Sequence, residues 1–292
     1  MDRKNFLKKT LVAGVAGALV PSLLNAKNVK VKKSDYDHFM KKVGFNHLPN
    51  KENNTMNRVY HKASTRGHAN HGWLDSHHTF SFANYHNPER MHFGVLRVLN
   101  DDRVAASQGF GTHPHDNMEI ISIPLEGDLE HKDSMGNVAV IKKGDVQVMS
   151  AGTGVFHSEF NKNKDYEVKF LQIWMFPNKK HVQPRYDQIS MREIEKDNAF
   201  FQILSPSSND QGVWAHQNAW FSIGQFSRIT EETYTLNDKG NGVYFFMLNG
   251  KATINEQTLN NRDGYGIWDV NQVTVTAEKD VRILLMEVPM SI

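Results

Sequence analysis

Short apolar runs, separated by turns that contain glycine, dominate the chain from Asn57 onward. In the first half of the chain these runs are Val95–Leu99, Glu119–Pro124, Val138–Ile141, Val146–Met149 and Val168–Phe176. The last of them is apolar on both alternating faces, as is typical of a strand that is buried on both sides. Many short strands at regular spacing are typical of a β-sandwich or a β-barrel. The pattern therefore predicts an all-β fold.

A second and fainter strand series follows toward the C-terminus. Its runs are Val243–Leu248, Ala252–Ile254, Val273–Ala277 and Val281–Met286. The segment Leu248-Asn249-Gly250 repeats the form of Leu125-Glu126-Gly127, so two barrels of one kind are the economical interpretation. Residues 177–180, Pro-Asn-Lys-Lys, interrupt the strand pattern between the two series. We therefore expect an N-terminal barrel over residues 57–180 and a C-terminal barrel over residues 181–292.

The first 56 residues differ in composition from the rest of the chain. A basic start at residues 2–9 is followed by an uncharged stretch, Thr10–Ala26, that is shorter than the roughly 20 residues of a membrane span. This order predicts a signal peptide at residues 1–26, export to the periplasm, and no stable membrane insertion after cleavage. Residues 27–56 are rich in lysine and asparagine and predict a linker or surface arm.

The route of export is open at this stage. The segment Arg3-Lys4-Asn5-Phe6-Leu7-Lys8 is similar to a twin-arginine signal, but Lys4 stands where the second arginine is usual. The general secretory route therefore remains an alternative, and a cytosolic protein with a chance basic start is another.

Charge and cysteine content narrow the classes of function. Without residues 1–26 the formal net charge falls from +2 to −1. The remaining chain therefore lacks the excess of positive charge that is typical of proteins that bind nucleic acid. The chain has no cysteine, so it has neither disulfides nor thiolate metal ligands. Of its 15 histidines, 13 precede residue 160, which directs attention to the first half of the chain.

Two pairs of side chains at alternate positions predict a metal site in the N-terminal barrel. Residues i and i+2 of a strand point to the same face, roughly 6.5–7 Å apart. His113 and His115 form one such pair, and His157 and Glu159 form the other. Two pairs that face each other inside a small barrel would supply four ligands to one metal. Glu119 lies four residues after His115 with the same parity, so spacing alone leaves it open as the carboxylate ligand.

The motifs around these pairs resemble the pirin family. They include Gly111-Thr112-His113-Pro114-His115, the strand end Leu125-Glu126-Gly127, and the segment from Ser150 through Ala151-Gly152-Thr153-Gly154 to His157-Ser158-Glu159. The resemblance implies two tandem cupin (jelly-roll) β-barrels with a metal site in the N-terminal barrel only. It also implies that Glu159, rather than Glu119, is the fourth ligand beside His113, His115 and His157.

The resemblance further implies a function. Pirins usually carry iron, so Fe(II) is the expected metal, although the nitrogen and oxygen ligand set also suits Cu, Ni, Mn or Zn. Quercetinase-active pirins imply a dioxygenase that uses dioxygen to open a flavonol-type phenolic substrate, with Glu159 as the catalytic base. The alternative is a non-catalytic binding or redox-sensing module with a protein partner. We expect a monomer that binds no nucleic acid.

Several further histidines lie between His61 and His92. Their spacing matches no compact metal site, and the resemblance treats this stretch as scaffold. We therefore expect no second metal there. The only histidines after residue 160 are His181 and His216, ahead of the second strand series, so the C-terminal barrel is predicted to be free of metal.

Overall fold

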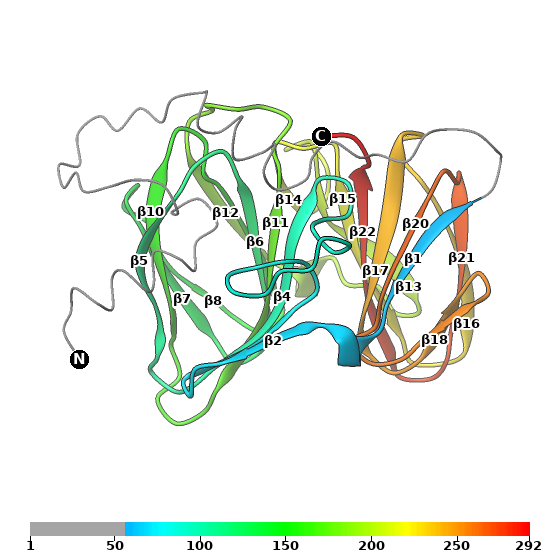
Figure 1. Ribbon diagram of the computed structural model, residues 1–292, viewed down its shortest axis with the longest axis horizontal. Helices are drawn as coiled ribbons and strands as arrows, with labels where there is room; N and C mark the ends of the chain where they lie inside the picture. Colours follow the sequence, from blue (N-terminus) through cyan, green and yellow to red (C-terminus); the bar gives the residue numbers. More distant parts are fainter. Residues whose placement is uncertain (1–55) are drawn as a thin grey trace.

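The computed structural model describes residues 56–292, which form β-strands joined by turns (Figure 1). These residues include two short 3-10 helices, Ala63–Thr65 (η1) and Met191–Glu193 (η2), and no α-helix. Within this range no helix is long and apolar enough to cross a membrane. The predicted all-β class with two cupin barrels is confirmed. The predicted signal peptide and all of the predicted arm except Met56 lie outside the described residues.

The N-terminal barrel consists of a seven-stranded and a four-stranded sheet. The larger sheet has the order β12 (Arg185–Ser190), β9 (Asp145–Ser150), β6 (Glu119–Glu126), β11 (Val168–Met175), β4 (Leu96–Val104), β3 (Leu74–His78) and β2 (Gly67–Asn70). The smaller sheet has the order β5 (Gly109–His115), β10 (Val155–Asn161), β7 (Leu129–Asp133) and β8 (Val138–Ile141). Neighbouring strands are antiparallel throughout both sheets.

The C-terminal barrel repeats this division into seven and four strands. Its larger sheet has the order β1 (Asn57–His61), β20 (Gly264–Trp268), β17 (Asn241–Asn249), β22 (Val281–Pro289), β15 (Trp220–Phe226), β13 (Ala199–Ser205) and β14 (Val213–Trp214). Its smaller sheet has the order β16 (Thr230–Thr235), β21 (Gln272–Ala277), β18 (Ala252–Ile254) and β19 (Gln257–Leu259).

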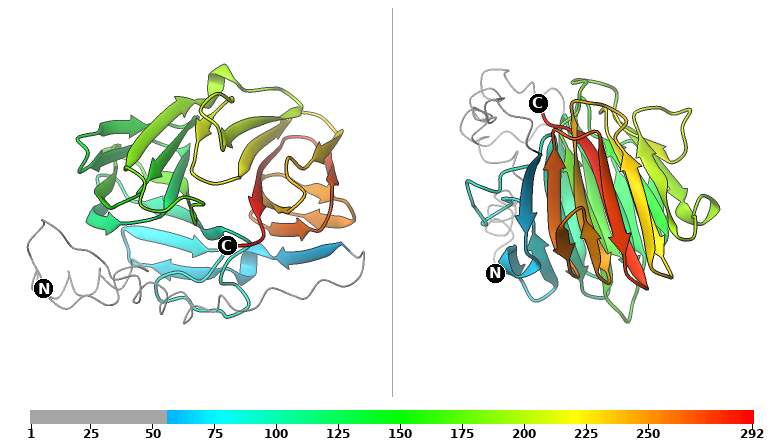
Figure 2. Two further views of the ribbon diagram at one scale, coloured as in Figure 1. Left: turned by 90° about the horizontal axis from the view of Figure 1, so that it is seen from above. Right: turned by 90° about the vertical axis from the view of Figure 1, so that its right-hand side faces the viewer.

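Strand pairing crosses the predicted division of the chain at both ends. Strand β1 falls in the range predicted for the N-terminal barrel, yet it pairs with β20 in the C-terminal barrel. Strand β12 falls in the range predicted for the C-terminal barrel, yet it pairs with β9 in the N-terminal barrel. The barrels lie side by side, and the segment from β1 to β3 runs along one side of both (Figure 2, left).

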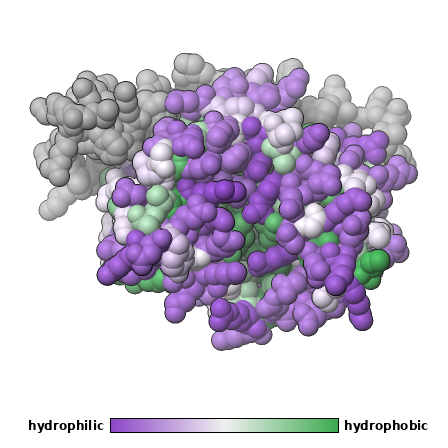
Figure 3. Space-filling view, turned by 90° about the horizontal axis from the view of Figure 1, so that it is seen from below, coloured by the Kyte–Doolittle hydropathy of each residue, from purple (hydrophilic) through white to green (hydrophobic). Residues whose placement is uncertain are grey.

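The largest apolar core lies between the two barrels. It joins residues of both seven-stranded sheets, among them Leu99, Ile121 and Leu171 on one side and Phe221 and Leu284 on the other. Seen from below, the surface is mostly hydrophilic, and hydrophobic residues show near its middle and at a few places toward its edges (Figure 3). The two barrels therefore share a buried interface.

The interiors of the two barrels differ. The C-terminal barrel is filled by one apolar cluster that runs from Phe226 to Leu285 along the chain. The N-terminal barrel has two smaller clusters, one around Ile120 and Trp174 and the other around Leu129 and Phe170. Buried polar residues also belong to its strands, among them His157, Glu159 and Gln172. The N-terminal barrel thus has an interior that can support polar chemistry.

Candidate metal centre

Three histidines of the smaller N-terminal sheet come together inside the barrel. His113 and His115 lie on β5, which is an edge strand of its sheet, and His157 lies on the neighbouring β10. Pro114 separates the first two, and an edge strand tolerates a proline because its missing N–H need not bond to another strand.

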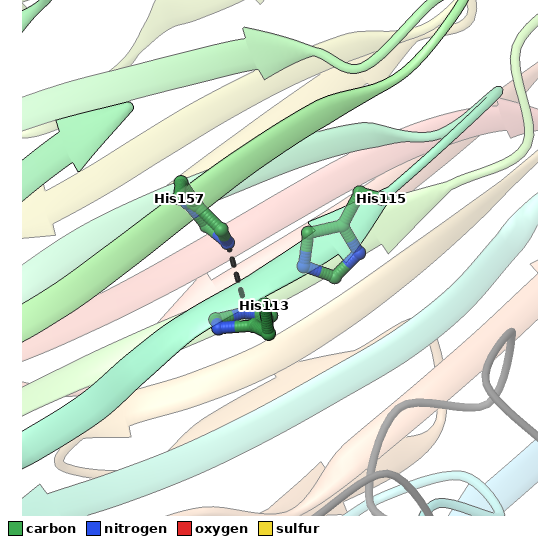
Figure 4. Close-up of side chains that lie close together, drawn as sticks. All are labelled: His113, His115 and His157. Atoms are coloured by element: carbon green, nitrogen blue, oxygen red, sulfur yellow. Dashed lines mark hydrogen bonds between the residues drawn. The ribbon is translucent and has the colours of Figure 1, made fainter. Parts of the chain in front are cut away.

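The three imidazole rings point toward one another (Figure 4). Their ring centroids lie 4.4 to 4.9 Å apart, and one nitrogen from each ring falls within 4.8 Å of the other two. The Nε2 atoms of His113 and His157 are 3.0 Å apart. Two ligands at about 2.1 Å from one tetrahedral metal lie about 3.4 Å apart, so the spacing suits a shared ion.

Hydrogen bonding and burial prepare these rings to act as ligands. The Nδ1 atom of His113 lies 2.8 Å from the carbonyl oxygen of Gly111, which fixes the proton on Nδ1 and leaves Nε2 as the electron-pair donor. Nε2 of His115 and Nδ1 of His157 are buried without a hydrogen-bond partner. Burial lowers the pKa of His115 to about 3 and that of His157 well below its usual value. Neutral imidazole is the form that binds metal.

Glu159 lies on the same buried face of β10 as His157, with Val155 and Asn161. Its carboxylate accepts hydrogen bonds from the Ser122 hydroxyl at 3.1 Å and from the Gln172 amide, which lies 2.9 Å from Oε2. The compact group of converging nitrogens does not include this carboxylate. Because a carboxylate has about four lone-pair sites, these two donors still leave sites for a metal or a proton.

Glu119, the alternative carboxylate, has other partners. Its Oε2 accepts hydrogen bonds from the Ser150 hydroxyl at 2.7 Å and from the backbone N–H of His216 at 3.2 Å. Burial raises the pKa of Glu119 to about 7, against the opposing effects of these two hydrogen bonds and of Arg185. Glu119 thus links the N-terminal barrel to the loop before β15, and it is absent from the group of converging nitrogens.

Two polar neighbours of this group, His131 and Asp133, were not predicted from the sequence. His131 on β7 pairs directly with Glu159 across the sheet, and its ring lies 5.3 Å from that of His157. Its Nε2 lies 3.0 Å from a carboxylate oxygen of Asp133, and its Nδ1 is buried without a partner. His131 and Asp133 stand at alternate positions, the same signal that identified the other two pairs.

The structure also corrects the expectation that no compact group exists between His61 and His92. His68 and His77 face each other across the hairpin of β2 and β3, and Asp75 joins them. Nine positions separate the two histidines along the chain, a spacing that only the hairpin turns into a contact.

The main group has the chemistry of a mononuclear metal site. Three neutral imidazoles, with Glu159 as the predicted fourth ligand, would leave a divalent ion with a net charge near +1 and with room for a further ligand. None of these donors is soft, so the set does not select one first-row metal over the others. An anionic oxygen ligand would neutralise such a site when it binds.

Comparison with known proteins places this geometry in a family context. The sequence profile described as Pirin matches residues 31–175, and the profile described as Quercetinase C-terminal cupin domain matches residues 202–288. A protein of Escherichia coli named quercetin 2,3-dioxygenase is 41% identical over 228 residues, which cover 78% of this chain and 97% of that protein. A pirin-like protein of Caulobacter vibrioides is 35% identical over 221 residues, which cover 76% of this chain and 95% of that protein.

Solved structures agree with these relatives. A bacterial pirin from Escherichia coli, in complex with nickel(II), superposes with a TM-score of 0.75 at 40% sequence identity. The superposition covers 80% of this chain and 99% of that one.

Proposed function

This chain belongs to the pirin family, and from that premise we propose that it is a metal-dependent dioxygenase that opens flavonol-type phenolic substrates. One observation carries the proposal: the nitrogens of His113, His115 and His157 converge, and Nε2 of His115 is buried there without a hydrogen-bond partner. With Glu159 they would hold one divalent metal, and we propose Fe(II) as the resident ion. When bound, that ion would act as a Lewis acid toward the substrate's enol oxygen and ease its deprotonation.

Glu159 is the proposed base for that proton. It lies two residues after His157 on the same buried face of β10, so both side chains point into the barrel interior. Hydrogen bonds from Ser122 and Gln172 hold its carboxylate in one orientation. A fixed base within hydrogen-bond reach of the hydroxyl is what general base catalysis requires.

The barrel interior supplies a wall for a flat aromatic molecule. Val98, Ile120, Met149, Val155 and Trp174 form an apolar cluster, and Trp174 packs edge-on against His115 with ring centroids 4.9 Å apart. Such a surface excludes water and favours aromatic ligands with a few oriented polar groups.

Polar atoms beside this wall offer contacts to substrate hydroxyls. Nε1 of Trp174 and Oδ1 of Asn100 are buried without a hydrogen-bond partner. Asn100 pairs directly with Gln172 across β4 and β11, so both side chains lie on the same face of the sheet. A donor and an acceptor at these places suit a polyphenol better than a purely apolar ligand.

The proposal is tested with metal-loaded protein and a flavonol such as quercetin under air. We expect dioxygen uptake, loss of the flavonol absorbance, and release of carbon monoxide as the central ring opens. No uptake with any flavonol at full Fe(II), Ni(II) or Cu(II) loading would overturn the proposal. Capture of a protein partner under those conditions would instead support a binding module.

We also propose that the protein acts outside the cytoplasm as a monomer. The order of a basic segment, an uncharged stretch and Ala26 supports the export proposal. Expression of the full chain followed by cell fractionation and intact-mass analysis tests it, with cleavage after Ala26 as the expected result. Metal analysis of the same sample tests iron as the resident ion, and sedimentation tests the monomer.

A further inference from the structure

A second group of ligand-type side chains lies on the hairpin of β2 and β3, away from the barrel interior. His68 on β2 and Asp75 and His77 on β3 place one ligand atom each within 4.8 Å of the others. Strand β2 is the edge of the seven-stranded N-terminal sheet and runs along the bottom of the molecule in Figure 1. Nothing in the proposed flavonol chemistry uses these residues.

The hairpin register creates this group. His68 and His77 are directly opposite each other, so their side chains share one face, and their rings stack with centroids 4.5 Å apart. Asp75 precedes His77 by two residues and therefore lies on that face as well. Its Oδ1 is 2.8 Å from Nε2 of His68 and 3.7 Å from Nδ1 of His77.

These distances have the scale of a metal site. Ligands at about 2.1 Å from a tetrahedral ion stand about 3.4 Å apart, between the two distances observed here. Two imidazoles and one carboxylate are also the protein ligands of many open zinc sites, in which water takes the remaining position. A modest rotation of the stacked rings would turn both nitrogens toward one ion.

Charge and exposure permit a cation to enter. The side chains of His68, Asp75 and His77 are 51%, 34% and 34% exposed, so solvent reaches all three. Arg66 lies near enough for its charge to act on His77. The guanidinium of Arg66 is itself paired with Asp101 at 3.2 Å, and Arg262 shares that carboxylate at 3.0 Å.

We propose that His68, Asp75 and His77 form a second, solvent-accessible site for a divalent transition metal of the zinc, nickel or copper class. Bound metal would tie edge strand β2 to β3 and stabilise the native state, because the ligands come together only in the folded hairpin. The alternative is a hydrogen-bonded His68–Asp75 pair that binds no ion. Only metal binding distinguishes the two.

Equilibrium dialysis against Zn²⁺ alone, followed by elemental analysis, tests the proposal. We expect wild-type protein to bind one equivalent more than the double variant His68→Gln/His77→Gln. The variant His86→Gln removes one exposed histidine outside the group and should bind as much as wild type. Because the proteins are otherwise identical, any binding elsewhere in the chain cancels. Equal Zn²⁺ binding by wild type and the double variant would overturn the proposal.

A second measurement requires no substitution at the hairpin. In His157→Ala protein, which lacks a ligand of the main centre, Zn²⁺ should still shift the imidazole nitrogen resonances of His68 and His77 in long-range ¹H–¹⁵N spectra. Unshifted resonances at saturating Zn²⁺ would overturn the proposal and show that His68 and Asp75 form a pair that binds no ion. Survival of this signal without flavonol turnover would show that the second site stands independently of the proposed activity.

Discussion

His113 and His157 pair directly across β5 and β10, and their Nε2 atoms face each other at 3.0 Å. Nδ1 of His113 is engaged by the Gly111 carbonyl, so the Nε2 electron pair of His113 is directed at its partner. Such an arrangement is favourable when a cation lies between the rings or when one ring donates a proton. The strand register therefore places the ligands before any metal arrives.

Replacement of His157 by alanine should remove the main metal. One of the three converging imidazoles is lost, and the change should lower affinity by more than about 100-fold, the upper end for partners that only orient a ligand. Elemental analysis should show one equivalent of metal fewer than in wild type, together with loss of flavonol turnover. Ser158→Ala, on the opposite face of the same strand, should keep both. Full metal content in His157→Ala would contradict the assignment.

Two isosteric variants decide between the carboxylates. Glu159→Gln should lose the main metal, because the amide cannot replace the charge of a carboxylate ligand beside His157. Glu119→Gln should retain it, because Glu119 is bound by Ser150 and the His216 backbone instead. Metal content after dialysis is the measurement. The opposite outcome, with metal lost from Glu119→Gln and kept in Glu159→Gln, would make Glu119 the ligand.

Much of the fold is legible in the sequence because the apolar runs of both barrels have strand length. The predicted runs Val138–Ile141 and Ala252–Ile254 coincide with β8 and β18. The sequence does not show which strands pair. Strand β1 joins the C-terminal barrel by pairing with β20, which lies more than 200 residues away along the chain. No local sequence pattern could predict a contact between segments so far apart.

The same limit applies to the site. His113, His115 and His157 could be predicted because each pair alternates within one strand and the family motif surrounds them. His131 was missed because its place beside Glu159 depends on the register of β7 against β10. The spacing of His68 and His77 along the chain gives no sign of contact, although a hairpin makes residues nine positions apart direct neighbours. Whether Glu159 binds the metal remains a prediction.

Glu119 should make stability fall as pH rises. Burial raises its pKa from 4.5 to about 7, so the native state holds the proton more tightly than the unfolded chain does. The stabilisation is complete below pH 4.5 and is lost as pH rises through 7, by about 3 kcal/mol at about 1.4 kcal/mol per pH unit. Glu119→Gln removes this contribution. In urea unfolding, the variant should resemble wild type near pH 5 and be more stable than it at pH 8, and a constant difference across that range would contradict the assignment.

The two barrels should unfold together because they share the largest core. Leu171 of β11 and Leu284 of β22 are both fully buried in that core, one from each barrel. Leu171→Ala should lower the free energy of unfolding by about 2–5 kcal/mol through lost burial and the cavity left behind. Tryptophan fluorescence can follow each barrel separately, in one variant that keeps only Trp174 and in another that keeps only Trp268. If the shared core couples the barrels, Leu171→Ala should shift the unfolding midpoint equally for both probes. Ile229→Ala serves as the control, since this side chain is 77% exposed and its loss should change stability by less than about 0.5 kcal/mol. A shift confined to the Trp174 probe would show instead that the N-terminal barrel unfolds independently.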